Sequence, residues 1–306
     1  MAPLKGDSVT LLYREPITEQ QQHDKFKLTV FKVVHGFNKM LLSHGASGSC
    51  NIDVACREHG DKPQVRSVGM LLTDDHQRYC SGALINNANG DGKQYFLTAN
   101  HCVFSDVSYF IVGFNYQYEK CYPQGVNKAV KREPIAQLVQ GLRLVSQWEK
   151  TDYALLEIKE PIPDSYNVYL AGFDLSEQPA SDVHAIHHPS GDVKKISTFK
   201  GSLHAASWSE GPTMSFHLQV PAWTEGVTER GSSGSPLFTK DGLIIGHLRG
   251  GQSSCEYPTG YDLYGGIAYD WSKPERADDR LSKYLNPGGQ KHVKRVEGAY
   301  LKDLRK

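Results

Sequence analysis

One short loop in the second half of the chain has the composition of a nucleophile site: Gly231-Ser232-Ser233-Gly234-Ser235-Pro236. A serine nucleophile needs a sharp turn that exposes its Oγ, and nearby backbone N–H groups that stabilise a developing oxyanion. The two glycines permit such a turn, and the amides of Gly231 and Ser233 can then point to one spot. By itself this segment is more often an ordinary Gly/Ser loop between strands, so the residues upstream decide its interpretation.

Two upstream residues could complete the chemistry of Ser233. His101 follows the apolar run 95–99, and Asp152 precedes the apolar run 153–158. A histidine can accept the serine proton near neutral pH, and a carboxylate can fix its tautomer and stabilise the imidazolium. Each residue alone would more often be structural, because the chain has 13 histidines and many carboxylates. Their joint occurrence at strand ends, in the order His, Asp, Ser, predicts a catalytic triad.

Short β-type runs separated by turn residues must position these groups. In the first half of the chain they lie at 65–72, 80–85, 95–99, 109–114, 135–145 and 153–158. After Pro161 and Pro163 they recur at 168–173, 183–187, 195–199, 215–220, 235–238, 243–248 and 264–271. Six antiparallel strands make one small barrel, and the second set predicts another barrel of similar size. We expect an all-β fold of two six-stranded antiparallel β-barrels.

The two ends of the chain differ from this pattern. Leu281, Tyr284 and Leu285 have helical spacing, which predicts a helix over 274–285 that closes the second barrel. We expect residues 288–306 to form a frayed basic tail and residues 1–44 to be a polar appendage or pro-region. The expected units are therefore 1–44, a first barrel 45–165, a second barrel with its helix 166–287, and the tail.

The overall composition of the chain limits the kinds of partner that the protein could bind. Lys plus Arg and Asp plus Glu both number 34, so no overall charge attracts nucleic acid or a membrane surface. No apolar run is long enough to span a membrane, and no signal peptide is visible at the start. We expect a monomer that needs no cofactor and acts on polypeptides.

The cysteines and the clustered histidines bear on metal binding. No C-x-x-C pair occurs among Cys50, Cys56, Cys80, Cys102, Cys121 and Cys255, which favours three disulfides and a secreted or extracellular protein over a metal site. His184, His187 and His188 have no acidic or cysteine partner at ligand spacing, so we interpret them as structural and predict no metal.

Several segments together resemble the trypsin-like serine endopeptidases, and within them the bacterial lysyl endopeptidases. These segments are 47–54, 95–102, 151–158, 185–189, 226–236 and 250–255. The resemblance implies a chymotrypsin-type double barrel with the triad in the cleft between the barrels. It also implies the pairs Cys50–Cys255, Cys56–Cys121 and Cys80–Cys102. Zymogen-activated animal enzymes have an Asp at the position of Ser232 that pairs with a new N-terminal amine, so the resemblance excludes that switch here.

The resemblance also suggests how a substrate would be selected. Val227 stands where trypsin has its pocket acid, whereas lysyl endopeptidases use an Asp in an Asp-x-Tyr-Gly run, here Asp262-Leu263-Tyr264-Gly265. A buried carboxylate would favour a Lys substrate over a neutral one, and the Lys stem would pack between Thr228 and Gly250. Trp208 matches the family tryptophan that stacks on a histidine, but Arg249 occupies the histidine position.

Three functions stay open at this point. The first is a serine endopeptidase that cleaves after Lys through an acyl-enzyme. It would be made as a precursor, and the bond between Lys39 and Met40 is a site that the enzyme itself could cut. The second is a glutamyl endopeptidase, because Thr228 and His247 lie near the positions where that group binds a carboxylate; Asp262 would repel such a substrate. The third is an inactive protease-like binding protein, although such proteins usually lack a triad member.

Overall fold

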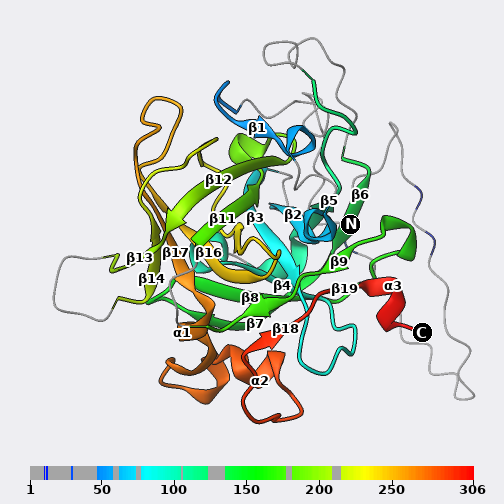
Figure 1. Cartoon of the computed structure of the whole chain (residues 1–306). Coiled ribbons are helices and arrows are strands. Elements are labelled where there is room, and N and C mark those ends of the chain that lie inside the picture. The colour runs from blue at the N-terminus through cyan, green and yellow to red at the C-terminus, as the bar shows by residue number, and fades with distance from the viewer. Residues whose placement is uncertain are drawn as a thin grey trace, which may run out of the picture.

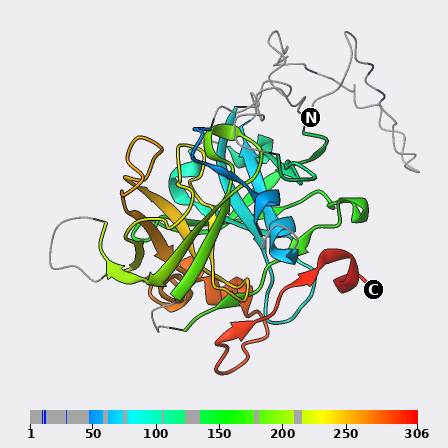
Figure 2. The same cartoon turned by 45° about the horizontal axis from the view of Figure 1, so that its top comes forward.

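The computed structural model describes residues 47–57, 62–73, 77–104, 106–122, 135–176, 181–208 and 215–306, with the single residues 10, 12 and 29. The expected appendage, including Lys39 and Met40, otherwise lies outside the described residues. The fold is mostly β, with two large sheets that lie side by side in two views (Figure 1, Figure 2). Within the described residues, no helix has the length and apolar character to cross a membrane.

The N-terminal sheet has seven antiparallel strands. Its order is β6-β5-β2-β3-β4-β8-β7. The strands are β2 (Val68–Leu72), β3 (Arg78–Ile85), β4 (Tyr95–Ala99), β5 (Ile111–Phe114), β6 (Gln137–Gln140), β7 (Leu142–Trp148) and β8 (Tyr153–Ile158). The two edge strands, β6 and β7, are joined by one residue, so the sheet must curl until its edges meet there.

That joining residue also corrects the predicted strand count. The expected single strand over 135–145 is split at Gly141, whose φ is +88°. Its amide donates to the carbonyl of Phe110 at 3.2 Å, and its carbonyl accepts from the amide of Lys159 at 2.9 Å. Because a left-handed residue breaks the extended run, the chain changes partner here from β5 to β8. Six strands were therefore too few.

The C-terminal sheet has ten strands, and its main path is β1-β12-β11-β15-β16-β17-β14-β13. They are β1 (Ile52–Asp53), β12 (Lys195–Ser202), β11 (Ser181–His187), β15 (Pro236–Phe238), β16 (Ile244–Gly251), β17 (Asp262–Gly266), β14 (His217–Val220), β13 (His204–Ala206), and off the path β10 (Phe173–Asp174) and β18 (Arg295–Val296). Only Leu203 separates β12 from β13, so this sheet also curls back on itself. The expected strand at 168–173 is divided between β9 (Tyr169–Leu170) and β10.

The helical prediction near the end of the chain is only partly right. Of the helix expected over 274–285, only the end forms an α-helix, α2 (Leu281–Leu285), preceded by a 3-10 turn at Ala277–Asp279. A further helix, α1 (Ile267–Ser272), occupies most of the strand expected at 264–271. Only Leu281 and Leu285 are fully buried in α2, so one turn packs against the core. The charged residues before it have no apolar face that would extend the helix.

The expected frayed tail is wrong. Residues after 288 form β18, which pairs with β10, then β19 (Ala299–Tyr300), which pairs with β9, then α3 (Leu301–Leu304). Figure 1 shows this segment running along the outside of the molecule from α2 to the C-terminus. Leu301 is buried in the core of the N-terminal sheet. Apolar residues spaced among the basic ones thus anchor a segment that composition alone assigns to solvent.

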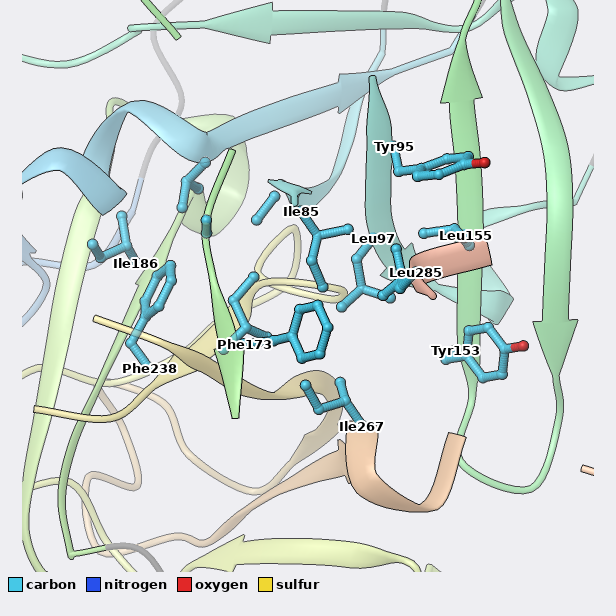
Figure 3. Close-up of a cluster of buried hydrophobic side chains, with 14 of the residues drawn as sticks. Ile85, Tyr95, Leu97, Tyr153, Leu155, Phe173, Ile186, Phe238, Ile267 and Leu285 are labelled. Atoms are coloured by element: carbon cyan, nitrogen blue, oxygen red, sulfur yellow. The ribbon is translucent and has the colours of Figure 1, made fainter. Parts of the chain in front are cut away.

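One apolar cluster joins the two sheets. Figure 3 shows Ile85, Leu97 and Leu155 of the N-terminal sheet in the same cluster as Phe173, Ile186 and Phe238 of the C-terminal sheet. Ile267 of α1 and Leu285 of α2 close it. Because interiors of this kind pack densely, the cluster fixes the two sheets relative to each other, and with them the loops that bear the candidate site residues.

Candidate active site

The Gly231–Pro236 loop lies against the end of β4. Gly234 has a φ of +79°, and a Cβ there would lie 2.3 Å from Thr98 Oγ1 and 2.6 Å from the Ala99 amide nitrogen. Only glycine fits this contact. The carbonyl of Ser233 accepts from the Ser81 amide at 2.9 Å and lies 4.0 Å from Cys102 Sγ. The loop therefore adjoins the 3-10 turn Asn100–Cys102 that contains His101.

The three serines of this loop differ in exposure. Ser232 and Ser235 are fully buried, whereas Ser233 is partly exposed. The backbone amides of Gly231 and Ser233 donate to no acceptor within the described part of the chain. Gly231 has a φ of +90°, a backbone conformation that favours glycine. Ser233 is thus the serine of this loop that a substrate could reach, beside two amides with free hydrogen-bonding capacity.

His101 and Asp152 form a close pair. His101 Nδ1 lies 2.6 Å from Asp152 Oδ2, and the backbone amide of His101 donates to Oδ1 at 2.9 Å. The Asn100 amide donates to the carbonyl of Asp152 at 2.6 Å. The His101 side chain is 43% exposed and that of Asp152 only 7%. The pair therefore has a buried acid and an imidazole edge open to solvent, the arrangement that a general base requires.

A second, fully buried pair, His247 and Asp270, lies behind the turn that contains Asp152 and supports it through Thr151. Asp152 has a φ of +67°, which is uncommon for a residue other than glycine. The neighbouring Thr151 Oγ1 donates to Asp270 Oδ1 at 2.5 Å, and His247 Nε2 lies 2.9 Å from Asp270 Oδ2. Burial raises the pKa of Asp270, an effect that the hydrogen bond from His247 opposes. Neither Thr151 nor Asp270 was identified from the sequence, where nothing marks a residue of α1 as close to this turn.

Asp262 lies at the start of β17 and is almost fully buried, at 1% exposed. Its Oδ2 accepts from Trp223 Nε1 at 2.6 Å and from Thr228 Oγ1 at 2.8 Å. Its Oδ1 accepts no hydrogen bond from the described residues. A Cβ at Gly251 would lie only 2.4 Å from this oxygen, so the absence of a side chain at 251 leaves room beside it. Trp223 is a partner that sequence reasoning missed.

Burial dominates the electrostatics of Asp262. It raises the pKa of this carboxyl to about 6, against the lowering effect of the hydrogen bonds from Trp223 and Thr228. The backbone amide of Ser253 lowers the pKa as well. An approaching cation would stabilise the charged form further, because opposite charges attract strongly at a buried site.

Trp208 and Arg249 lie together, as the resemblance implies for their positions. The guanidinium carbon of Arg249 is 4.5 Å from the Trp208 ring centroid, and a Cβ at Gly250 would lie 3.6 Å from the same ring. Arg249 Nη1 donates to the carbonyl of Lys150 at 3.0 Å and lies 3.4 Å from His217 Nε2. Burial, and then Arg249, lower the pKa of His217 to about 4, so this histidine is neutral. His217 was also missed, since its type alone marks no role.

The other candidates from the sequence do not gather at one point. His184 Nε2 contacts Gln64, His187 lies between two serines, and His188 Nδ1 lies 2.9 Å from the carbonyl of Asp192. Among the described residues, one group has metal-like spacing: Cys80, His101 and Cys102. Its two sulfurs are bonded to each other, so it offers no thiolate. The residues singled out for glutamyl specificity contact different carboxylates, Thr228 that of Asp262 and His247 that of Asp270.

Three disulfides link distant parts of the described chain. They are Cys50–Cys255, Cys56–Cys121 and Cys80–Cys102, the pairs that the resemblance implies. The first joins the start of the described chain to the connection between β16 and β17, and the third joins β3 to the turn with His101.

Comparisons with known proteins identify one matching family and a named relative. The family "Lysyl endopeptidase, C-terminal domain" matches residues 44–265. A Pseudomonas aeruginosa protein named "Lysyl endopeptidase" is 29% identical over 253 residues, which cover 78% of this chain and 50% of that protein. The chain therefore spans about half the length of that relative.

Two solved structures are more distant. The inactive form of Rv3671c from Mycobacterium tuberculosis H37Rv has a TM-score of 0.44 at 14% identity, covering 74% of this chain and 90% of that one. A serine endoprotease from Yersinia pestis has a TM-score of 0.44 at 18% identity, covering 68% of this chain and 61% of that one. Likenesses at this level support no argument about the site. The family match spans most of the chain, and the chain belongs to the family of the lysyl endopeptidase C-terminal domain.

Proposed function

We propose that this chain is a serine endopeptidase that cleaves peptide bonds after Lys. Ser233 is the nucleophile, His101 its general base, and Asp152 the acid that fixes the imidazole. The observation that best supports this is the 2.6 Å distance between His101 Nδ1 and Asp152 Oδ2. The turn that contains His101 adjoins the loop in which Ser233 is the partly exposed serine. Membership of the lysyl endopeptidase family supports the same reaction.

The reaction would proceed in two stages. Ser233 Oγ attacks the carbonyl carbon of the scissile bond while His101 Nε2 takes the hydroxyl proton, and the amides of Gly231 and Ser233 stabilise the oxyanion. The C–N bond then breaks as His101 returns the proton to the leaving amine. Water, deprotonated by His101, hydrolyses the ester in the same way and releases the new carboxyl terminus and free Ser233.

Selectivity for Lys would come from Asp262. The ammonium of a substrate Lys would meet the Oδ1 oxygen that lacks a partner among the described residues, directly or through one water. The aliphatic stem would pack between Thr228 and Gly250. Arg needs a bidentate partner and more room than a compact ammonium, so Lys is the better fit. The positive charge of Arg249, which is stacked on Trp208, repels any cation and so weakens the binding of a substrate Lys.

Two other functions are less well supported. A glutamyl endopeptidase would place a substrate carboxylate near Asp262, and the repulsion disfavours it. An inactive binding protein would have no use for the close His101–Asp152 pair, but a negative labelling result would favour it.

The wider expectations belong to the same proposal. We propose that the two curled sheets are the two barrels of a chymotrypsin-type fold with the site between them. Three disulfides support an oxidising compartment, and hence secretion. We further propose a monomer without cofactor, and removal of the N-terminal segment so that the active protein begins between Met40 and Gly45. N-terminal sequencing of active protein tests this last point, and full activity in protein that still starts at Met1 contradicts it.

A fluorophosphonate label followed by a peptide-library profile tests the function. Labelling at Ser233 and cleavage after Lys are expected. An unlabelled protein would favour the binding protein, and cleavage after Glu would favour the second alternative.

A further inference from the structure

A chain of hydrogen bonds runs beneath the oxyanion loop and contains one histidine. Ser232, immediately before the proposed nucleophile, points its Oγ to His187 Nδ1 at 2.7 Å. His187 Nε2 lies 3.1 Å from Ser197 Oγ, and that hydroxyl donates to the carbonyl of Val227 at 2.7 Å. His187 and Ser232 are both fully buried. The imidazole thus connects the two ends of the segment that leads into Ser233.

The directions of the hydrogen bonds in this chain follow from its Val227 end. The Val227 carbonyl can only accept, so the Ser197 hydroxyl hydrogen goes to it, and Ser197 Oγ accepts from His187 Nε2. The ring proton of a neutral His187 is therefore on Nε2, and its Nδ1 accepts from the Ser232 hydroxyl 2.7 Å away. Ser232 Oγ also accepts from the Glu229 amide at 3.2 Å.

The surroundings of His187 keep it neutral. Complete burial, and then the positive charge of Lys195, lower the pKa of His187 to about 3. Lys195 Nζ is itself held by Asp53 Oδ1 at 2.5 Å and lies 3.8 Å from Asp192 Oδ2. A protonated His187 would present an N–H to Ser232 from Nδ1, and the buried hydroxyl hydrogen would lose its acceptor.

The loop is also held from its other side. Ser81 Oγ donates to the carbonyl of Gly231 at 2.8 Å, and the amide of His188 donates to the same Ser81 oxygen at 2.9 Å. A Cβ at Gly231 would lie 2.9 Å from the His188 carbonyl. His187, the last residue of β11, therefore contacts the loop through its ring Nδ1. The following residue, His188, adjoins the loop through its carbonyl and, by way of Ser81, through its amide.

We propose that neutral His187, protonated on Nε2, is a positioning residue that holds the Gly231 and Ser233 amides in their oxyanion-binding arrangement. The inference rests on the proposed function, because it assigns these amides to a transition state. In zymogen-activated animal enzymes, an Asp at the position of Ser232 forms an ion pair with a new N-terminal amine. Here the uncharged imidazole of His187 holds Ser232 by a hydrogen bond instead, so the loop would be ordered without such an amine.

Kinetics of matched variants test the proposal. His187→Leu removes both hydrogen bonds, whereas His187→Gln can still accept from Ser232 and donate to Ser197. His184→Leu is the control, because His184 is a buried histidine on the same strand that contacts Gln64 and Phe238 instead of the loop. We expect His187→Leu to lower kcat by about 100-fold, the loss seen when an oxyanion donor is removed, with little change in KM. His187→Gln should recover most of kcat, and the control should retain it.

Two inhibitors separate a catalytic defect from general loosening. A lysyl aldehyde forms a hemiacetal whose oxygen needs the loop amides, whereas a simple alkylamine occupies the Lys pocket alone. In His187→Leu the aldehyde should bind roughly 100-fold more weakly, in proportion to kcat, and the amine should bind nearly as before. Equal weakening of both inhibitors, or unchanged kcat in folded His187→Leu and Ser232→Ala, would overturn the proposal.

Nitrogen-15 NMR of the histidine rings gives a readout that does not depend on turnover. The His187 signals, assigned by their loss in His187→Gln, should show a protonated Nε2 and an unprotonated Nδ1 from pH 5 to 8. A His187 that titrates in this range overturns the bridge even in active enzyme. Wild-type protein that shows this tautomer but neither labels nor cleaves would instead refute the proposed function.

Discussion

Asp152 binds His101 twice, through the ring Nδ1 at 2.6 Å and through the backbone amide at 2.9 Å. The second bond ties the carboxylate to the main chain of the turn that contains His101, so the acid and the base cannot separate without disrupting that turn. The Asn100 amide also donates to the carbonyl of Asp152. Together these hydrogen bonds fix the orientation of the His101 ring as well as its tautomer.

The first prediction concerns the nucleophile. Ser233→Ala and His101→Ala should each reduce kcat by about 10⁴-fold or more, because triad members act as a unit. Ser235→Ala should retain much more activity, since Ser235 is buried. Steady-state kinetics on a lysyl ester, with mass spectrometry of the fluorophosphonate adduct, is the measurement. An adduct on Ser235 would contradict the assignment.

A second prediction concerns substrate selection. Asp262→Asn should abolish the preference for Lys while reaction with a fluorophosphonate continues. Lys should exceed Arg in kcat/KM by about tenfold to a hundredfold in the wild type, if one ill-fitting polar contact separates them. Arg249→His should raise Lys cleavage by removing a repelling charge. Lysyl, arginyl and glutamyl esters compared on these forms test the assignment, and an unchanged Lys preference in Asp262→Asn would show that the pocket acid lies elsewhere.

The third prediction is that the difference in stability between wild type and Asp262→Asn depends on pH, because the pKa of Asp262 is raised. Burial raises this pKa from 3.8 to about 6, so the native state binds the proton more tightly than the unfolded state does. The charged carboxylate therefore destabilises the fold above pH 6, and this cost disappears as the pH falls through 6 toward 4. Asp262→Asn should stabilise the protein at pH 7 by up to about 3 kcal/mol, and the gain should vanish near pH 4.

Denaturant unfolding of wild type and Asp262→Asn across pH 4–8 measures that difference. Asn can still accept from Trp223 and Thr228, so the comparison isolates the charge. A stability difference that does not vary with pH would mean that Asp262 is ionised normally.

A fourth prediction concerns the support of Asp152. Thr151→Val removes the hydrogen bond to Asp270 and should lower kcat by about tenfold, because Asp152 is held in an unfavourable backbone conformation that needs its neighbours. Thr151→Ser keeps the hydroxyl and should remain near wild type. Ser67→Ala, which removes another buried hydroxyl bonded to a carbonyl at 2.7 Å, is a control for stability alone. Equal kcat in Thr151→Val and Ser67→Ala would contradict the role.

The fifth prediction concerns the long-range disulfide. Replacing Cys50 and Cys255 by Ser should cost about 2–5 kcal/mol in the free energy of unfolding, because the bridge closes a very long loop. Removing Cys56–Cys121, which closes a shorter loop, should cost less: the sequence separations are 205 and 65 residues. Denaturant unfolding compares the two double variants, and a larger loss for Cys56–Cys121 would contradict the loop-entropy argument.

The local pattern of the chain was enough to predict most strands and the order of the candidate catalytic residues. Apolar alternation is a short-range property, so β3, β4 and β8 could be located from their own residues. The family resemblance added the cysteine pairs and the position of Asp262, since long motifs in a fixed order constrain which segments meet. Where local chemistry and packing disagreed, as at Gly141 and in the basic tail after residue 288, the sequence prediction was wrong.

Only the tertiary structure decided which polar groups are buried together. Nothing in the sequence distinguishes Ser233 from Ser235 by exposure, places Asp270 behind Thr151, puts Trp223 on Asp262, or connects His187 to Ser232. The physical reason is that the partner of a buried polar group is set by the relative placement of elements far apart in the chain, and that placement depends on the apolar cluster between the two sheets. The residue types that could do chemistry could be recognised in the sequence. Their exposure, the positions of their protons and their supporting contacts exist only in the folded molecule.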